Sequence, residues 1–207
     1  MSNFAIQDHI AIITGSAQGF GKQFAIRLLE NQAKVCISDC NPELGRNTTE
    51  ELKELFGDDK VTFKECDVTK KEDWDALWDH AERFFGDQVT LLINNAGIGP
   101  EYGWKKCLDV MLIGTSYGTF LALEKMSIAN DKKGGRIINI ASMAGKASST
   151  QFYLRILWCF IFFGFFLGLL EGGRNIGKKF TRFATQINSF TVVHTIIAQL
   201  KCQKPNM

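Results

Sequence analysis

The eight residues TGSAQGFG, positions 14–21, have the composition and spacing of a loop that holds a phosphate group. They follow a short apolar run and open a segment with helical spacing, which is the context this glycine pattern requires. Gly15 permits a tight turn, Gly19 leaves room for a pyrophosphate, and Gly21 allows close packing of helix on strand. The N–H groups at the start of that helix would bind the phosphates. The candidate contacts are Gly15, Ser16, Gln18, Gly19, Phe20 and Gly21; the alternative is a glycine-rich turn without a ligand.

A carboxylate, Asp39, ends the next apolar run, 18 residues after Gly21. At this spacing an acidic side chain accepts hydrogen bonds from the adenosine ribose hydroxyls and repels a 2′-phosphate. The glycine loop contains no Lys or Arg that would bind that phosphate. The sequence therefore predicts NAD rather than NADP as the cofactor. In the alternative interpretation Asp39 is only a polar residue at a strand end.

These groups must be positioned by a regular fold, and up to about residue 141 short apolar runs alternate with longer segments of helical spacing. Strands are expected at residues 9–14, 34–39, 61–66, 90–94 and 136–141, and helices at 20–32, 42–56, 70–85 and 104–126. Alternation of this kind predicts an α/β fold, a Rossmann-type doubly wound parallel sheet with helices on both faces. The pattern stops after the fifth strand, so the sheet is expected to be truncated there.

Composition limits the classes of function. The 207 residues are 45% hydrophobic and 22% charged, with a net charge of +2, which gives no reason to expect a nucleic-acid partner. The six cysteines show no zinc-ligand spacing and the three histidines stand far apart, so no metal site is expected. The start MSNFAIQDHI has no basic region followed by an apolar core, and unpaired thiols suit a reducing compartment. The expected location is cytoplasmic.

Taken together, the motifs resemble those of the short-chain dehydrogenase/reductase family in order and spacing. The resemblance rests on TGSAQGFG, Asp39, CDVT at residues 66–69, NNAG at 94–97 and the serine of IINIASMAG, and it covers residues 1 to about 152. Within the family, the stretch from NNAGIGPEYGWKKCL to GGRIINIASMAG looks most like the 15-hydroxyprostaglandin dehydrogenases. The resemblance implies an NAD-dependent oxidoreductase that removes a hydride from a secondary alcohol. A small alcohol or ketone is then the expected substrate.

The resemblance also assigns site residues by position. Asp67 would lie beside the adenine ring, and Asn95 and Gly97 on the nicotinamide side of the cofactor crevice. The expected cofactor contacts also include Cys40, Val68 and Ala96. Ser142 would hydrogen-bond the substrate oxygen, the alternative being a turn residue at a strand end. The motif residues follow the carboxyl ends of expected parallel strands, where open α/β sheets bind ligands.

The chain departs from the family at the residues that move the proton. The family uses a tyrosine, a lysine four residues later that lowers the tyrosine pKa, and an asparagine in the long helix. Here the nearest tyrosine is Tyr153, only 11 residues after Ser142, and the fourth residue after it is Leu157. Met111 stands where the family has its helix asparagine. Tyr153 is therefore the candidate acid/base, and the activity of the chain is in doubt.

The composition changes at Tyr153. From there on, seven Lys and Arg stand against one acidic residue, whereas the part up to Phe152 has 17 against 21. We therefore expect a cofactor domain at residues 1–152 and a divergent tail at residues 153–207 with no recognised domain. One hypothesis is that splicing, a frameshift or a gene-model error joined other coding sequence after Phe152.

The tail begins with an apolar run, ILWCFIFFGFFLGLL, from Ile156 to Leu170. As a helix it would span about 22 Å, less than the roughly 30 Å hydrocarbon core of a bilayer. Three alternatives stay open: a core helix, a segment that contacts a membrane, and an unfolded remnant. The basic residues that follow would suit either a membrane face or a solvated loop.

Two functions of different class follow from these patterns. In the first, the chain is an NAD-dependent oxidoreductase in which Ser142 orients the substrate oxygen and Tyr153 transfers the proton. In the second, it is a catalytically inactive nucleotide-binding or interaction protein, associated with membranes through its tail. Many relatives pair through the long helix and the tyrosine helix, of which only the long helix is recognisable here, so a homo-oligomer is one alternative and the sequence does not give the oligomeric state.

Overall fold

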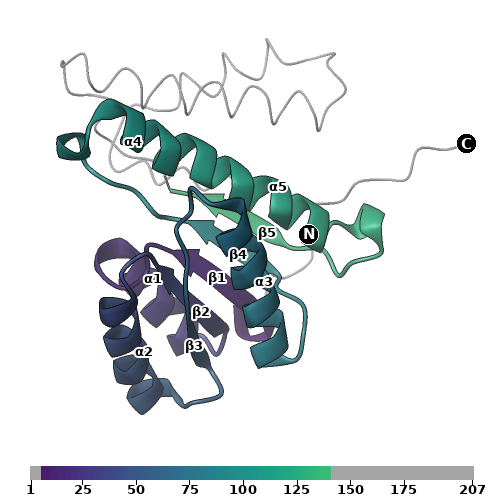
Figure 1. Ribbon diagram of the computed structural model, residues 1–207. Coiled ribbons are helices and arrows are strands. Elements are labelled where there is room, and N and C mark those ends of the chain that lie inside the picture. Colours follow the sequence, from purple (N-terminus) through teal and green to yellow (C-terminus); the bar gives the residue numbers. More distant parts are fainter. Residues whose placement is uncertain (1–5, 141–207) are drawn as a thin grey trace, which may run out of the picture. The chain divides into compact units, whose positions relative to one another are not determined.

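A computed structural model describes residues 6–140 of the chain (Figure 1). In this part, five strands form one parallel sheet with the order β3-β2-β1-β4-β5. The strands are β1 (Ile10–Thr14), β2 (Lys34–Asp39), β3 (Val61–Glu65), β4 (Leu91–Asn94) and β5 (Arg136–Asn139). The strand order reverses direction at β1, with β2 on one side and β4 on the other. The predicted Rossmann-type doubly wound sheet is thus confirmed.

The helices connect the strands as expected. They are α1 (Gly19–Glu30), α2 (Pro42–Phe56), α3 (Lys71–Phe85), α4 (Trp104–Leu108) and α5 (Thr115–Met126), with 3-10 turns η1 (Ile6–Asp8), η2 (Pro100–Tyr102) and η4 (Ile128–Asn130). Helix α2 has Pro42 at its first position, and the Asn41 side chain accepts a hydrogen bond from the N–H of Leu44 (3.0 Å). Helix α3 ends at Gly86, whose φ of 70° lies in the left-handed region. Local sequence signals thus fix both helix boundaries.

Two apolar cores lie on opposite faces of the sheet. Along β1, Ile10 and Ile12 face the side of α3 and α5, whereas Ala11 and Ile13 face the side of α1 and α2. This alternation is the period of two that a strand imposes on its side chains. All four residues are 5% exposed or less, so β1 is buried on both faces. Figure 1 shows the two pairs of helices on the two sides of the sheet.

The predicted helix at residues 104–126 is one continuous helical segment, but it is not α-helical throughout. Between α4 and α5 lies a π-helical turn, η3 (Asp109–Gly114), which accommodates one extra residue. The segment Trp104–Met126 has the length and mean hydropathy, 1.2, that a membrane-crossing helix would also have. This is weak evidence for a membrane span, because core helices share these properties and this helix packs on α3, β4 and β5.

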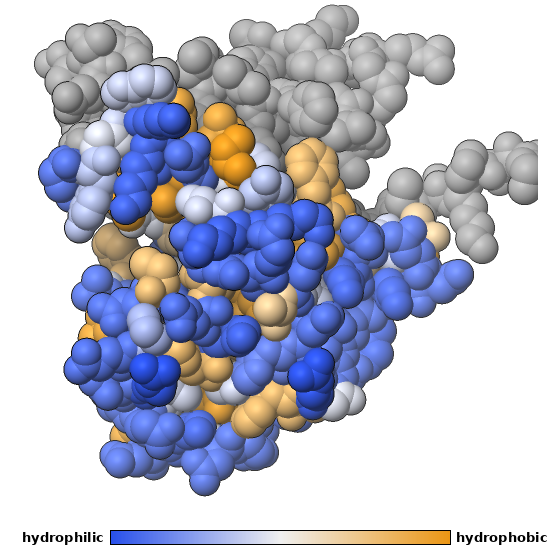
Figure 2. Space-filling model, viewed as in Figure 1, coloured by the Kyte–Doolittle hydropathy of each residue, from blue (hydrophilic) through white to orange (hydrophobic). Residues whose placement is uncertain are grey.

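One surface of this long helix is apolar. Ile113, Tyr117 and Phe120 are spaced three and four residues apart and are 41%, 36% and 52% exposed. Figure 2 shows apolar side chains along the long helix, while hydrophilic side chains dominate over α2 and α3. Several sequence-based predictions lie outside the described residues: Ser142, Tyr153, the apolar run from Ile156 to Leu170, the boundary at Phe152 and the end of the sheet after β5.

Candidate functional site

The candidate site lies where β1 and β4 end side by side. The two strands are parallel and in register from Ala11 and Leu91 to Ile13 and Ile93, so their carboxyl ends reach the same edge of the sheet. The strand order reverses between them, and ligands bind at such switch points in open α/β sheets. The loop after β1 carries the glycines, and the loop after β4 carries the NNAG motif. The structure therefore brings together two motifs that lie about 80 residues apart in the sequence.

Thr14 joins these two loops. Its hydroxyl oxygen accepts hydrogen bonds from the backbone N–H groups of Asn95 and Ala96, both at 3.1 Å. The side-chain amide of Asn95 also donates to the carbonyl oxygens of Thr14 (3.0 Å) and Gly15 (2.9 Å). The carboxamide predicted to lie on the nicotinamide side is thus bonded to the phosphate loop. Asn95 thus links the loop after β1 to the loop after β4.

The glycines of the loop have different physical roles. Gly15 (φ 62°) and Gly19 (φ 58°) have backbone conformations that favour glycine. A Cβ atom on Gly15 would approach Cα of Ala96 to 2.8 Å, so the loop after β4 lies directly against it. A Cβ atom on Gly21 would lie 2.7 Å from the Asn95 amide nitrogen, whereas one on Gly19 would meet nothing within 4 Å. The open space is therefore at Gly19, where a pyrophosphate was expected.

Buried side chains hold the glycine loop, residues 14–21, in place through hydrogen bonds. Ser16 is fully buried, donates to the carbonyl oxygen of Ile13 (2.6 Å) and accepts from the N–H of Ser38 on β2 (2.9 Å). Thr48 on α2 donates to the carbonyl oxygen of Ala17 (2.6 Å). The Ser16 hydroxyl thus faces the protein interior and shapes the loop rather than projecting from it.

Two further loop residues mark the start of α1. Gln18 is the N-cap residue, and its side chain makes no capping hydrogen bond. Phe20, in the first turn, is 77% exposed, an unusual position for a large aromatic side chain. Both predicted contacts therefore lie at the helix N-terminus, where backbone N–H groups attract anions.

Asp39 lies directly beside the loop. One of its carboxylate oxygens accepts a hydrogen bond from the N–H of Ala17 (3.1 Å), and the other accepts from the N–H of Asn41 (3.1 Å). These two bonds fix the orientation of the carboxylate at the end of β2. Each oxygen keeps lone pairs that a pair of hydroxyl groups could use. Cys40, the next residue, is exposed as a whole, but the partial burial of its thiol, followed by the charge of Asp39, raises the pKa of that thiol.

Asp67 and Val68 form the loop after β3. The Asp67 carboxylate accepts from the backbone N–H (3.0 Å) and the hydroxyl (2.8 Å) of Thr69, which makes a tight turn before α3. The carbonyl oxygen of Val68 accepts from the indole N–H of Trp74 (2.9 Å). A Cβ atom on Gly114 of the long helix would come within 2.7 Å of the Val68 side chain. The predicted adenine-side residues are thus fixed by α3 and by the π-helical turn.

Gly97 and Met111 lie on the nicotinamide side. Gly97 is exposed, and a Cβ atom on it would lie 4.0 Å from the Met111 side chain. The thioether of Met111 therefore lies beside Gly97, at the position where the family has an asparagine. A thioether is only a weak hydrogen-bond acceptor, so it cannot hold water as a carboxamide does.

Sequence reasoning missed the polar residues that tie these loops together. They are Thr14, Ser38, Thr48, Asn94 and Asn139. The Asn94 amide donates to Asn139 at the end of β5 (2.8 Å) and to Thr119 on α5 (3.3 Å), which fixes β5 just before Ser142 in the sequence. For the strand residues the signal was a polar residue in or beside an apolar run, whereas Thr48 lies in a polar part of α2 and gave none.

Comparison with known proteins supports this interpretation of the motifs. The family described as short chain dehydrogenase matches residues 9–154. The chain is 38% identical over 140 residues to human 15-hydroxyprostaglandin dehydrogenase [NAD(+)], a match that covers 68% of this chain and 52% of the relative. It is 32% identical over 148 residues to an NADP-dependent (R)-specific alcohol dehydrogenase of Lentilactobacillus kefiri, covering 68% and 56%. The chain thus spans about half the length of the curated relatives it matches.

Solved structures agree with these matches. A short chain dehydrogenase/reductase from Burkholderia phymatum, crystallised in complex with NAD, superposes with a TM-score of 0.69 at 25% identity, covering 79% of this chain and 60% of that one. A hydroxysteroid dehydrogenase from Escherichia coli gives a TM-score of 0.62 at 28% identity, covering 72% and 60%. The predicted likeness to 15-hydroxyprostaglandin dehydrogenases is confirmed at the level of sequence identity. On the family match, the fold and the motifs, the chain belongs to the short-chain dehydrogenase family.

Proposed function

We propose that the chain binds NAD and acts as an oxidoreductase on a secondary alcohol. The observation that supports this most is the position of Asp39, whose carboxylate is bonded to the N–H of Ala17 inside the glycine loop. A charge at that position meets the ribose end of a dinucleotide whose pyrophosphate lies at Gly19 and the start of α1. The residues fit the cofactor: open space at Gly19, close backbone approach at Gly15, and a carboxylate at the ribose end.

NAD would supply a hydride acceptor at the nicotinamide end, and residues of this chain would do the rest. Asn95, Ala96 and Gly97 form the wall beside the nicotinamide. Ser142 orients the substrate oxygen, and Tyr153 takes its proton. The human relative is named 15-hydroxyprostaglandin dehydrogenase [NAD(+)]. This name supports the oxidation of a hydroxyl group with NAD as the hydride acceptor.

Cofactor choice is tested by thermal stabilisation of the purified full chain. A ligand at about 100 times its Kd adds about 2.7 kcal/mol of stability, so binding is readily seen as a rise in melting temperature. We expect NAD to raise it more than NADP. In Asp39→Asn, which keeps the size and one hydrogen-bond acceptor but removes the charge, the preference for NAD should shrink.

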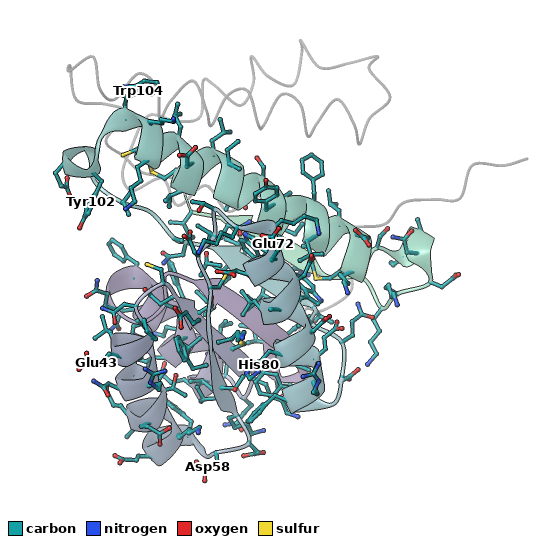
Figure 3. The ribbon with its side chains drawn as sticks, in the orientation of Figure 1. Glu43, Asp58, Glu72, His80, Tyr102 and Trp104 are labelled. Carbon is teal, nitrogen blue, oxygen red and sulfur yellow. The ribbon has the colours of Figure 1, made fainter. Side chains whose placement is uncertain are left out.

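The matched control is Asp58→Ala. Asp58 is an exposed carboxylate in the turn before β3, at the opposite end of the sheet from the glycine loop (Figure 3). This variant should keep the preference of the unmodified chain. Equal stabilisation by NAD and NADP, unchanged in Asp39→Asn, would remove Asp39 from the cofactor site. The NADP dependence of the Lentilactobacillus relative makes this a real alternative.

A second candidate function is nucleotide binding without turnover. Two residues favour it: Leu157 stands where a lysine would lower the pKa of Tyr153, and Met111 lies beside Gly97 in place of an asparagine. A tyrosine side chain with no neighbouring cation is a poor base at neutral pH, because the unperturbed phenol has a pKa of about 10. The two candidate functions are distinguished by adding a secondary alcohol, such as a 15-hydroxyprostaglandin, to a sample in which NAD binding has been measured. Only the first predicts that NADH forms. Stabilisation by NAD without NADH would select the second.

We also propose that the chain is cytoplasmic and forms a homo-oligomer. It would contact membranes through the run from Ile156 to Leu170. The support for membrane contact is the 15-residue apolar composition of that run, followed by basic residues. Co-sedimentation of the full chain with lipid vesicles tests it, with a variant carrying Phe162→Asp and Phe163→Asp as control. A chain that stays in the supernatant as a monomer without detergent would exclude both membrane contact and the oligomer.

A further inference from the structure

Cys40 and Cys66 follow two paired strand ends. Strands β2 and β3 are in register up to Asp39 and Glu65, and the N–H of Cys66 donates to the carbonyl oxygen of Asp39 (3.1 Å). Cys40 and Cys66 are the next residues along each chain segment. Partners in a parallel pair share a face of the sheet, and neighbouring strands lie about 4.8 Å apart. The spacing at the last ladder pair, Asp39 and Glu65, falls within the range of Cα distances that a disulfide bridges, and the two cysteines directly follow this pair.

The two thiols differ in exposure and influence each other. Cys40 is exposed, whereas Cys66 is only 2% exposed, and both are free thiols in this structure. The pKa of Cys66 is raised to about 12, mainly by burial, with smaller contributions from Asp73, Asp67 and Cys40. An exposed thiol next to a buried one has the arrangement of a redox pair, in which the first meets the oxidant and the second resolves the adduct.

The pair is also adjacent in sequence to the two acidic residues of the candidate site. Cys40 directly follows Asp39, and Cys66 directly precedes Asp67. We propose that Cys40 and Cys66 form a disulfide on oxidation and that this bond weakens nucleotide binding at Asp39. The second half of this inference rests on the proposed function, because it requires the nucleotide to bind beside Asp39.

The oxidant can be a small disulfide such as oxidised glutathione. The Cys40 thiolate attacks one of its sulfurs, forms a mixed disulfide and releases one glutathione thiolate. The Cys66 thiolate then attacks the Cys40 sulfur, forms the intramolecular bond and releases the second glutathione. The two cysteine protons go to the released thiolates, and the two electrons reduce the oxidant. Because both pKa values are raised, thiolate is scarce at neutral pH and the rate increases from about pH 7 to about pH 9.

The effect on the site follows from the turn after β2. Asp39 is oriented by the N–H of Asn41, which donates to its second carboxylate oxygen (3.1 Å), and Cys40 lies between these two residues. Because Cys40 is exposed and Cys66 is buried, a bond between them requires the Cys40 side chain to turn inward, which rotates the backbone between Asp39 and Asn41. The carboxylate then loses the orientation that suits the ribose hydroxyls, so NAD binds more weakly.

The experiment incubates the full chain with oxidised glutathione and maps its thiols by mass spectrometry. Trypsin releases residues 35–46, with Cys36 and Cys40, and residues 65–70, with Cys66, so fragmentation of the linked peptides identifies the bonded cysteine. We expect a Cys40–Cys66 link with loss of two hydrogen atoms. The rise in melting temperature given by NAD should fall to less than about half in the oxidised chain and recover with dithiothreitol.

Variants separate the steps. Cys66→Ala should stop at a glutathione adduct on Cys40, Cys40→Ser should give no link to Cys66, and Cys107→Ser should behave as the unmodified chain. A link through Cys36, a link between chains, or a persistent adduct in the unmodified chain would overturn the disulfide. A Cys40–Cys66 disulfide that leaves NAD stabilisation unchanged would overturn the regulatory half. If the reduced chain does not bind NAD, both the proposed function and the regulatory effect of the disulfide are overturned. Mass spectrometry still tests whether the Cys40–Cys66 disulfide forms.

Discussion

Asn95 donates two hydrogen bonds to Thr14, which lies 81 residues earlier in the sequence. The hydroxyl oxygen of Thr14 accepts from the N–H of Asn95, and the Asn95 amide donates to the carbonyl oxygen of Thr14. Thr14 ends β1 and Asn95 follows β4, so the pair links the two loops of the candidate cofactor crevice. The stability of the domain and the shape of its site thus depend on the same contact.

Thr14→Val tests this contact. Thr14 is 1% exposed, so valine would leave the N–H groups of Asn95 and Ala96 buried without an acceptor. We expect the free energy of unfolding to fall by about 2 kcal/mol, within the range of about 1–3 kcal/mol for an unsatisfied buried group. NAD binding should weaken as well. Thr14→Ser, which keeps the oxygen, is the control in urea unfolding, and equal losses in both variants would show that the hydroxyl is not the group that matters.

The glycines of the loop give a second prediction, because their surroundings differ. In Gly21→Ala the methyl group would meet the carbonyl oxygen of Gly15 and lie 2.7 Å from the Asn95 amide nitrogen. We expect a loss of about 3 kcal/mol, since overpacking against backbone cannot relax easily. In Gly19→Ala there is open space, and only the left-handed backbone conformation costs about 1 kcal/mol.

The two variants should affect NAD binding in the opposite order, with the larger loss of binding in Gly19→Ala. Gly19→Ala places a methyl group where the pyrophosphate is expected, so it should lose NAD stabilisation while keeping most of its fold. Calorimetry with and without NAD measures both quantities in one sample. A Gly19→Ala variant that binds NAD as the unmodified chain does would place the phosphates elsewhere.

His80 on α3 predicts a dependence of stability on pH (Figure 3). Burial lowers its pKa in the folded chain, and the positive charges of Lys64 and Arg83 lower it further. The folded state therefore binds fewer protons than the unfolded state just below pH 6.5, so this contribution to stability is present above about pH 6.5 and is lost as pH falls. In His80→Gln the stability between about pH 5 and pH 7 should be flatter. A parallel decline in both proteins would assign the effect to other groups.

Much of the fold could be predicted because the apolar pattern is strong. The predicted strand at residues 34–39 and helix at residues 42–56 have the observed bounds, and the other strands differ by one or two residues at an end. The strand predicted at residues 9–14, for example, begins at Ile10, since the pairing of β1 with β2 starts at Ile10 and Lys34. Asp39 was recognisable from its spacing to Gly21, since a dinucleotide fixes the distance between phosphate and ribose.

What could not be predicted depends on contacts between distant residues. Nothing near Thr14 in the sequence indicates that its hydroxyl accepts from Asn95 and Ala96, because the partners come from another strand. The π-helical turn Asp109–Gly114 was also missed, since one extra residue in a long helix alters the apolar spacing too little to be read. The fold shows that Gly114, the last residue of this turn, lies against Val68.

The final prediction concerns Gly118, where α5 packs on β4 and α3. A Cβ atom on Gly118 would collide with the ring of Trp74 and lie 2.6 Å from the Asn94 side-chain oxygen, a buried atom without a hydrogen-bond partner. Alanine favours a helix over glycine by about 1 kcal/mol, whereas overpacking costs about 1–3 kcal/mol or more. We expect overpacking to win and Gly118→Ala to lower the free energy of unfolding by about 2 kcal/mol.

A double-mutant cycle identifies the cause. Trp74→Phe removes the ring atoms nearest to Gly118, but it also leaves the Val68 carbonyl oxygen without its indole donor, so alone it should cost about 1–3 kcal/mol. If the collision is the cause, Gly118→Ala should cost less in the Trp74→Phe chain than in the unmodified one, with a coupling energy of about 1 kcal/mol or more. Additive losses would mean that the strain lies at Asn94 instead. In that case Gly118→Ala should cost less in an Asn94→Ala chain than in the unmodified one.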